Sequence, residues 1–433
     1  MSLLTDDVRA RALAAVTPLR LGQVAELLGL QVRVIGLAAA VGDLVAVEGD
    51  TRVLAEVAAS GPAGLTCLPL GDTAGLRVGD VVRHTGGPLQ IPVGDALRGR
   101  VLDGLGRPID GGPPLDHLPQ VGVTQAPPAA LSRPRIDHQV GLGVRALDSL
   151  TPCGRGQRIG IMAGSGVGKS SLLSMVARGT DAEVSVIALV GERGREVREF
   201  IENDLGPEGL ARSVVVVATS DAPPVERLRA AGVATRIAES FRDSGRHVVL
   251  MMDSLTRVAM AQREIGLSAG EPPATRGYPP SVFTLMPQLL ERAGTSATGS
   301  ITGLYTVLVE GDDMQDPIGD TARSILDGHV VLSRRLATAG HFPSIDVLES
   351  ISRVTRAVTD ADQRADATRL RRLLAAHRSV RELVEIGAYV AGADPDADVA
   401  LARMPAINDF LRQDMDESTS LADTWHALKE LVA

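Results

Sequence analysis

A glycine-rich segment, AGSGVGKS at residues 163–170, carries the clearest chemical signal in the sequence. Its glycines allow backbone N–H groups to turn inward around phosphate oxygens, where a Cβ atom would clash. The ammonium group of Lys169 can then reach the β- and γ-phosphates of a nucleotide, and the Ser170 hydroxyl can ligate Mg²⁺. An apolar run precedes the segment and a helical pattern follows it, as a phosphate-binding loop requires. The nucleotide contacts expected here come from Gly164, Ser165, Gly166, Val167, Gly168, Lys169, Ser170 and Ser171.

Two acidic residues follow other apolar runs and could serve the same site. Asp253 ends the run HVVLMMD, and a carboxylate at the end of a neighbouring buried strand can hold Mg²⁺ through water. Glu192 follows VIALVG, where an unprotonated carboxylate could orient the water that attacks the γ-phosphate. Spacing alone leaves a second interpretation open, in which Glu192 is a surface residue paired with Arg193 or Arg195.

Two later residues could complete such a site, although each also has an ordinary structural interpretation. Arg353 stands just before a helical region. An arginine supplied across a subunit boundary would neutralise charge that develops on the transferred phosphoryl group. The alternative is an ion pair within the chain. Phe342, in the segment HFPSID, could stack on an adenine ring or could pack in the core.

Apolar runs alternating with helical patterns must position these residues between about residues 140 and 355. The runs are near-continuous, which is typical of strands buried on both faces of a sheet. Alternation of such strands with helices predicts an α/β domain with a mostly parallel sheet. The runs are QRIGIMA, VSVIALVG, SVVVVAT, HVVLMMD and GLYTVLVEG.

The flanking regions have a different character. Residues 21–90 contain short apolar runs separated by glycine-bearing turns, which predicts a small β-barrel or sandwich. Proline and glycine punctuate residues 86–135 and indicate an extended connector. After about residue 357, helical spacing predicts a small helical bundle. Residues 1–20 form either a short amphipathic helix that docks a partner or a frayed tail.

Composition limits the classes of partner. The chain has 433 residues, which suggests two or three domains, and 44% of them are hydrophobic, enough for a large core. Its formal net charge of −9 argues against general nucleic-acid binding, which needs many phosphate-neutralising cations. The N-terminus does not read as a secretory signal, and no apolar stretch is long enough to span a bilayer. Cys67 and Cys153 are expected to be reduced, buried thiols.

Several segments together resemble one family. The set AGSGVGKS, VGERGREVREF, MMDSLTR, ATRGYPPSVF, GSITGLYTVLVEGDD, ARSILDGHVVLSR and FPSIDVLESISR is similar to the type III secretion and flagellum-specific ATPases. These are relatives of the catalytic subunit of rotary ATP synthases. The likeness is most specific from about residue 86 to 357. It is weaker over the expected barrel and the helical end.

The resemblance implies a multidomain fold and a shared site. The fold would comprise an N-terminal β-barrel, a central RecA-like α/β P-loop ATPase domain and a C-terminal helical bundle. The corresponding ranges are 1–20 for a partner-docking segment, 21–90, 91–357 and 358–433. ATP sites would lie between the subunits of a homohexamer. The matching motifs imply a role for each site residue. Lys169 and Ser170 would bind phosphate and Mg²⁺, with Asp253 as the metal-site acid. Glu192 would activate water, Arg193 and Arg257 would lie near the γ-phosphate, Phe342 would pack on adenine, and Arg353 would act on the neighbouring subunit's site.

The resemblance also implies partners and a place in the cell. It implies a stator-like regulatory protein at the N-terminal segment, a coiled-coil stalk protein, export substrates with their chaperones, and a membrane export gate. Such a motor uses ATP and Mg²⁺ in the cytoplasm, at the inner face of the cell membrane, and does not bind nucleic acid. The stretch Gln315-Asp316-Pro317 favours a flagellar over a virulence-type member.

Four alternatives differ in testable features. A virulence-type injectisome ATPase would share the same core. A rotary-synthase catalytic subunit usually leaves the arginine to a second chain, whereas here Glu192 and Arg353 share one chain. An RNA-translocating helicase would need stacking aromatics in its barrel, and residues 21–90 contain no Phe, Tyr or Trp. A non-catalytic nucleotide-binding subunit would typically lack Lys169 or Glu192, and both are present.

Overall fold

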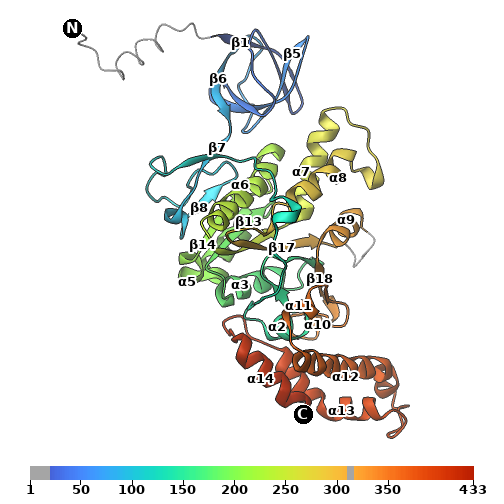
Figure 1. The fold of residues 1–433 in the computed structure, drawn as a ribbon. Coiled ribbons are helices and arrows are strands. Elements are labelled where there is room, and N and C mark those ends of the chain that lie inside the picture. Colours follow the sequence, from blue (N-terminus) through green and yellow to red (C-terminus); the bar gives the residue numbers. More distant parts are fainter. Residues whose placement is uncertain (1–19, 310–315) are drawn as a thin grey trace, which may run out of the picture. The chain divides into compact units, whose positions relative to one another are not determined.

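The computed structural model describes residues 20–309 and 316–433 and divides into two compact units, residues 1–89 and 90–433 (Figure 1). The expected partner-docking segment therefore lies outside the described residues, apart from Arg20, and so does Gln315. Among the described residues, no helix combines the length and the apolar character needed to cross a membrane.

The first unit contains a closed barrel of six antiparallel strands in the order β1-β2-β5-β4-β3-β6. Side chains alternate between its two faces, as the period of two in a strand requires. In β4, for example, Val53, Ala55 and Val57 point into the barrel core. The strands are β1 (Leu21–Leu28), β2 (Gln31–Ile35), β3 (Asp43–Glu48), β4 (Arg52–Gly61), β5 (Gly64–Pro69) and β6 (Val81–Pro88).

The second unit is built on a sheet in the order β19-β18-β12-β17-β15-β13-β14-β8. Every neighbouring pair from β18 to β8 is parallel, and only the edge strand β19 and the short β16 beside β17 run antiparallel. All five predicted apolar runs are strands of this sheet. The strands are β8 (Val101–Asp103), β12 (Arg158–Ala163), β13 (Val184–Val190), β14 (Ser213–Ala218), β15 (His247–Asp253), β16 (Gly294–Thr295), β17 (Ser300–Leu308), β18 (Gly328–Leu332) and β19 (Ile351–Ser352).

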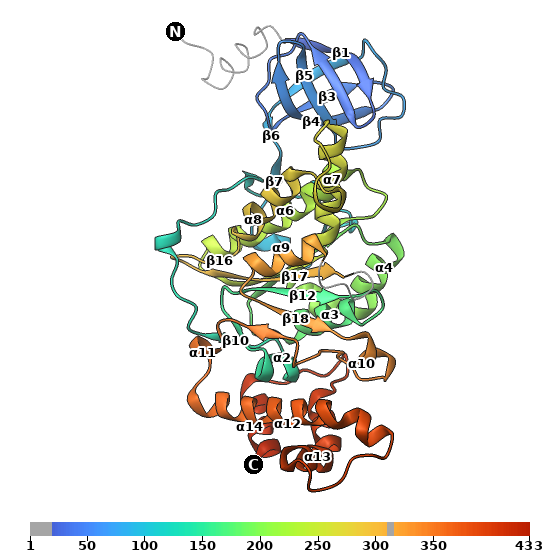
Figure 2. The same ribbon diagram turned by 90° about the vertical axis from the view of Figure 1, so that its right-hand side faces the viewer.

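Helices cover both faces of this sheet, which explains why its central strands are mostly apolar along their whole length. Figures 1 and 2 show α6, α7, α8 and α9 on one face and α2 and α3 on the other. The helices are α2 (Arg145–Leu150), α3 (Lys169–Gly179), α4 (Gly194–Glu199), α5 (Gly206–Ala211), α6 (Pro224–Asp243), α7 (Leu255–Ser268), α8 (Pro280–Leu290), α9 (Pro317–Ile325), α10 (Arg334–Thr338) and α11 (Thr355–Val358). A π-helical turn, Phe200–Leu205, joins α4 to α5.

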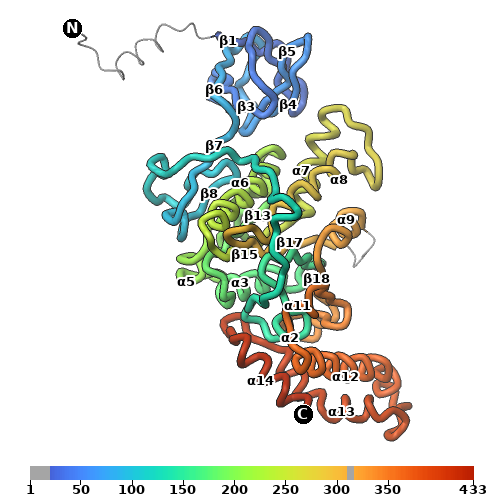
Figure 3. The backbone as a smooth tube through the Cα atoms, in the orientation of Figure 1, coloured from blue at the N-terminus to red at the C-terminus, as the bar shows by residue number. Residues whose placement is uncertain are grey.

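The segment predicted as an extended connector also contributes to the sheet. Most of its residues lie outside helices and strands, but Val101–Asp103 form β8 and pair with β14. Figure 3 traces the path of the backbone. Two further pairs of short strands occur in this part of the chain. β7 (Gln90–Pro92) pairs with β9 (Gln120–Gly122), and β10 (Gln139–Val140) pairs with β11 (Cys153–Gly154). Short 3-10 turns occupy Asp95–Leu97, Ala130–Ser132 and Thr275–Gly277.

Three helices complete the second unit: α12 (Ala361–Glu385), α13 (Pro395–Leu411) and α14 (Leu421–Val432). Each starts at a side-chain cap that satisfies otherwise free backbone N–H groups: Asp360, Asp394 and Ser420. Apolar residues of these helices join the hydrophobic core of the sheet domain. The fold class predicted from the sequence, an N-terminal β-barrel, a central α/β domain on a parallel sheet and a C-terminal helical region, is confirmed.

Gln413 ties the link between α13 and α14 to the sheet domain. Its side-chain amide donates to the carbonyl oxygens of Gly143 (2.7 Å) and Glu417 (2.9 Å) and accepts from the Arg145 N–H (2.9 Å). Its backbone N–H donates to the carbonyl oxygen of Phe342 (3.0 Å). Gln413 is buried, so these bonds are shielded from water. The link between α13 and α14 therefore bonds directly to the loop that carries Phe342.

Candidate nucleotide-binding site

The predicted phosphate loop lies where β12 ends and α3 begins. Gly166 and Gly168 adopt left-handed backbone conformations (φ 73° and 88°), which other L-residues rarely adopt. The loop is held in place from outside, because the Ser344 hydroxyl donates to the Val167 carbonyl oxygen (2.6 Å). Arg334 donates to the Ser165 carbonyl oxygen (3.3 Å). The backbone N–H groups of this turn and the N-terminus of α3 can therefore receive a phosphate.

Lys169 lies between two carboxylates. Its Nζ atom is 2.6 Å from Asp253 Oδ1 and 3.4 Å from Glu192 Oε1. The three residues come together because β12, β15 and β13 end at the same edge of the parallel sheet. Burial by itself would lower the pKa of Lys169, but the two carboxylates outweigh it and raise the pKa above its ordinary value. The raised pKa favours the ammonium form of Lys169, and its present partners are two carboxyl groups.

Glu192 faces this site rather than open solvent. Only 19% of its side chain is exposed, and burial raises the pKa of its carboxyl group against the opposing effect of Lys169. The surface ion pair considered from the sequence is formed by a different acid: Arg193, whose side chain is 76% exposed, pairs with Glu196 (3.0 Å). Glu192 thus joins Lys169, whereas the exposed Arg193 joins Glu196.

Asp253 is the most buried member of the site, with 3% of its side chain exposed. Besides Lys169, its Oδ1 atom accepts a hydrogen bond from the Thr306 hydroxyl (2.8 Å). Carboxylate and hydroxyl oxygens are the donors that Mg²⁺ prefers. Asp253 and the exposed Ser170 hydroxyl at the start of α3 fit that ion, and Ser171 is the next residue of the same turn.

Arg257 lies in the first turn of α7 and packs against the backbone of Gly191. A Cβ atom added to Gly191 would lie 2.9 Å from the Arg257 Cβ atom, so the close approach requires glycine. The Nε atom of Arg257 is buried and has no hydrogen-bond partner among the described residues. A buried unsatisfied donor is costly. Arg257 therefore fits a site that receives an anionic ligand.

Phe342 lies beside the phosphate loop on the loop that follows α10. A Cβ atom added to Gly168 would lie 3.4 Å from two atoms of the Phe342 ring. The ring is nevertheless 45% exposed, which is unusual for a phenylalanine that only fills a core. The exposed ring face beside the loop can receive a planar base.

Arg353 lies at the opposite edge of the sheet. It follows β19, which runs antiparallel to β18 and pairs Ser352 with Gly328, whereas the phosphate loop begins beside Leu332. Four residues of strand separate these two positions, or about 13 Å. Arg353 is exposed, and its guanidinium group donates to the Arg323 carbonyl oxygen (3.2 Å). Arg353 therefore does not join the phosphate loop of its own chain.

Sequence reasoning missed three residues that support the site. Thr306 bonds Asp253, and Ser344 and Arg334 bond the phosphate loop. For Thr306 there was a signal, since it is a polar residue within the apolar run GLYTVLVEG. Ser344 and Arg334 carry no comparable signal, because their role depends on how the loop after β18 folds back.

Family models match two parts of the chain. Residues 143–352 match "ATP synthase alpha/beta family, nucleotide-binding domain", and residues 359–430 match "T3SS EscN ATPase C-terminal domain". The first range contains the phosphate loop, Glu192, Asp253 and Phe342. The second range covers the three terminal helices.

Curated proteins and solved structures are similar over nearly the full length. The "Flagellum-specific ATP synthase" of Bacillus subtilis is 49% identical over 416 residues, 95% of each chain. The "Type 3 secretion system ATPase" of Xanthomonas euvesicatoria is 50% identical over 412 residues, 94% of this chain and 93% of the relative. The assembled ATPase EscN of the enteropathogenic E. coli type III secretion system superposes with a TM-score of 0.89 at 44% identity. That match covers 95% of this chain and all of EscN, and the same values hold for EscN in complex with its central stalk EscO.

Proposed function

The chain belongs to the family of flagellum-specific and type III secretion ATPases, and from this premise we propose that it is the Mg²⁺-dependent ATP-hydrolysing motor of a flagellar protein export apparatus. Hydrolysis would drive the unloading and delivery of export substrates. The observation that carries the proposal is the placement of Lys169 between Asp253 and Glu192 at the edge of the sheet where the phosphate loop begins.

The polyphosphate would replace the carboxylates as the partner of Lys169. In this proposal, the loop N–H groups and the Lys169 ammonium group bind the β- and γ-phosphates. Glu192 is then free to accept a hydrogen bond from the attacking water and to align it with the γ-phosphate. Mg²⁺, held through Ser170 and Asp253, would neutralise charge on the phosphate oxygens. Arg257, which has an unpartnered buried N–H, and the exposed Arg193 would act near the γ-phosphate, and Phe342 would stack on adenine.

We further infer that the site is completed by a second copy of the chain. Arg353 is too far along the sheet to serve its own phosphate loop, and it is exposed. Supplied to a neighbour, its guanidinium group would stabilise charge on the transferred phosphoryl group. The assembled state described for EscN supports this interpretation. A homohexameric ring would place one such arginine at every site.

The remaining assignments follow from family membership. EscN has been solved in complex with its central stalk EscO, which supports a coiled-coil stalk as a partner of this chain. We also propose a stator-like regulatory protein at residues 1–20, export substrates with chaperones, and a membrane export gate. The motor would work in the cytoplasm at the inner face of the cell membrane, without nucleic acid. The working parts of the chain would be residues 1–20, 21–90, 91–357 and 358–433.

The catalytic assignment can be tested with Glu192→Gln. The variant is expected to bind nucleotide with little change and to lose about 10²- to 10⁴-fold in kcat for ATP hydrolysis, the usual contribution of a positioned base. Glu199→Gln, an exposed residue at the end of the helix that follows, is the matched control and should keep full activity. Undiminished hydrolysis by Glu192→Gln would contradict the assignment.

The biological role needs a separate experiment, because flagellar and injectisome relatives are about equally similar (49% and 50% identical). A strain without the chain is expected to lack flagellar filaments, with wild-type chain but not Glu192→Gln restoring them. Normal filaments together with lost injectisome secretion would replace the flagellar role by the injectisome role and leave the ATPase assignment intact.

A further inference from the structure

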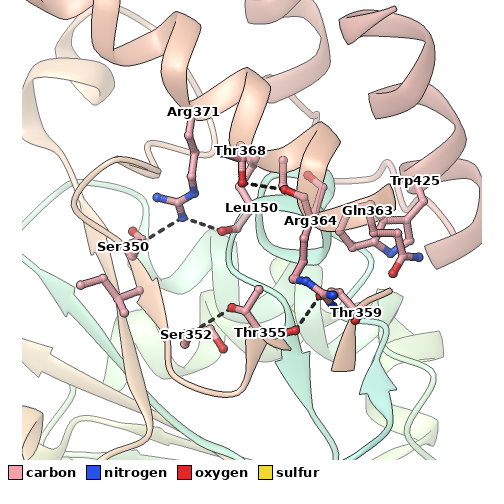
Figure 4. Close-up of a pocket in the computed structure, with 13 residues that line it drawn as sticks. Leu150, Ser350, Ser352, Thr355, Thr359, Gln363, Arg364, Thr368, Arg371 and Trp425 are labelled. Atoms are coloured by element: carbon pink, nitrogen blue, oxygen red, sulfur yellow. Dashed lines mark hydrogen bonds between the residues drawn. The ribbon is translucent and has the colours of Figure 1, made fainter. Parts of the chain in front are cut away.

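A cavity of about 270 Å³ lies between α12 and the segment that contains β19 and α11 (Figure 4). The end of α2 and Trp425 of α14 close its other sides. Two arginines, Arg364 and Arg371, line it, and its lining includes no aspartate or glutamate among the described residues. The cavity is separate from the phosphate loop, because Ser352 pairs with Gly328 at one end of β18, whereas the loop begins beside Leu332 at the other end.

Arg371 is a half-buried cation without an anionic partner among the described residues. Its Nη2 atom donates to the carbonyl oxygens of Leu150 (2.5 Å) and Ser350 (3.1 Å), as Figure 4 shows. Within the described part of the chain, no carboxylate lies within ion-pair distance of it. Asp346, the acid that acts on it from further away, is already paired with Arg378 at 2.5 Å. Burial lowers the pKa of Arg371, which reflects the cost of holding this charge without an anion.

Arg364 presents a second guanidinium group to the same cavity. It stands seven residues before Arg371, which places both side chains on one face of α12. It donates to the Thr359 carbonyl oxygen and, among the residues that the structure describes, has no carboxylate partner either. Two positive charges therefore face one small space, and no described acid lines it.

The other polar groups of the cavity decide what the ligand must be. The hydroxyls of Thr355, Thr359 and Thr368 donate their protons to backbone carbonyls. The Ser352 hydroxyl instead accepts from Gln157 (3.0 Å), so its own proton is available to a ligand. The Gln363 side-chain oxygen is also occupied, since it accepts from the Asp360 N–H (3.0 Å), which leaves its NH₂ group as a donor. The available groups are thus donors and cations, which together suit an anion.

We propose that this cavity binds a small oxyanion of the phosphate class, with Arg364 and Arg371 as its charged partners. A tetrahedral anion with several acceptor oxygens matches two guanidinium groups and additional neutral donors. Ser352 precedes Arg353 in the chain. If the role proposed for Arg353 holds, an anion bonded to Ser352 also steadies the residue that serves the neighbouring site. Anion binding itself does not depend on that role.

The test measures binding of inorganic phosphate to the full chain carrying Lys169→Ala, which weakens the nucleotide site. Calorimetry should show saturable binding. The emission of Trp425, the single tryptophan of the chain, should change over the same phosphate range because it lines the cavity. Arg371→Gln and Arg364→Gln should each weaken binding at least tenfold. Arg369→Gln, an exposed arginine of the same helix with no place in the cavity lining, should leave binding unchanged.

Folding controls and a charge-conserving variant distinguish lost anion binding from lost folding. Circular dichroism and Tm must show that each variant is folded, and Arg371→Lys should recover part of the binding because it keeps the charge. Competition with glycerol phosphate distinguishes phosphate esters from free oxyanions as ligands. If glycerol phosphate displaces inorganic phosphate, the site also binds phosphate esters; if it does not, the site is restricted to free oxyanions. Absence of saturable binding, or equal weakening by Arg369→Gln, would overturn the proposal. Loss of ATP hydrolysis by Glu192→Gln would be unaffected by either result.

Discussion

Two partly buried cations of the molecule, Lys169 and Arg371, are compensated in different ways. Lys169 lies against two carboxylates of its own chain, at 2.6 Å and 3.4 Å. Arg371 is held by two backbone carbonyls and has no carboxylate partner among the described residues. In the first place an incoming phosphate must compete with internal anions. In the second place, no carboxylate among the described residues competes with an incoming anion.

This difference separates two kinds of anion site. At the phosphate loop, two carboxylates of the same chain compensate Lys169, and in the proposed function a nucleotide would displace them. That arrangement suits a site that binds, reacts and empties in each cycle. A cation compensated only by carbonyl dipoles suits lasting occupancy, because nothing in the described chain replaces the anion when it leaves.

The strongest test of the contrast is removal of the lysine. Lys169→Ala is expected to lower kcat/KM for ATP by on the order of 10³-fold, because a charged donor aimed at the transferred group is lost. Lys429, the other lysine of the chain, is exposed on α14 and provides the control as Lys429→Ala. Steady-state hydrolysis measures both. Activity above about a tenth of the wild-type value in Lys169→Ala would contradict the proposed role of Lys169 in ATP hydrolysis.

The pH dependence tests the acid beside the lysine. Glu192 must be ionised to orient water, and burial raises its pKa above the ordinary value for glutamate of about 4.3. The ionised fraction falls as pH falls through this raised pKa, so kcat/KM should drop about tenfold per pH unit on an acid limb above about pH 4.3. The measurement is a kcat/KM profile over the range in which circular dichroism shows a folded chain. Glu192→Gln should lack this limb, and a limb that persisted in it would belong to another group.

A smaller effect is expected from the hydroxyl that supports Asp253. Thr306→Val keeps the shape of the side chain but removes the 2.8 Å hydrogen bond to the carboxylate. Hydrogen bonds to charged groups contribute about 1.5–3 kcal/mol, so the free energy of unfolding should fall by that amount. Denaturant unfolding measures it, with Thr284→Val on an exposed turn of α8 as the control. Equal effects in the two variants would mean that Asp253 does not depend on Thr306.

The smallest effect is expected at the second cation. In phosphate-free buffer, Arg371→Met should change the free energy of unfolding by only about 1 kcal/mol, because no described carboxylate loses its partner. Lys169→Met leaves two buried carboxylates facing each other and should cost about 3–5 kcal/mol. Denaturant unfolding of both variants checks the difference. Equal losses would show that the two cations are compensated alike, contrary to their contacts.

The central sheet could be predicted well because its strands are covered on both faces. Runs such as VSVIALVG and SVVVVAT are apolar at most positions and buried along their strands, and they form β13 and β14. β8 escaped prediction because it has three residues, lies at the edge of the sheet and is surrounded by Pro and Gly. Short edge strands depend on the register of their neighbour, and no local pattern records that register.

The site residues likewise divide into those that a local sequence pattern predicts and those that depend on the tertiary fold. Lys169 and Ser170 follow from a local motif, and the apolar runs before Glu192 and Asp253 place these acids at strand ends. Their mutual distances, and the choice of Glu192 rather than Glu196 as the partner of Lys169, depend on strand order. Ser344 reaches Val167 across a separation of 177 residues, which only the tertiary fold brings together. Arg353 and Phe342 stay predictions for nucleotide binding.

The bond from Gln413 to the Phe342 carbonyl has a mechanical consequence. The same glutamine is bonded to Gly143 and Arg145, so this buried residue joins three separate stretches of backbone. If the terminal helices turn as a body by more than a hydrogen-bond length, they must either break this junction or carry the aromatic ring with them. If Phe342 stacks on adenine as proposed, the affinity for the nucleotide would then vary with the angle of those helices, although the helices do not contact the nucleotide.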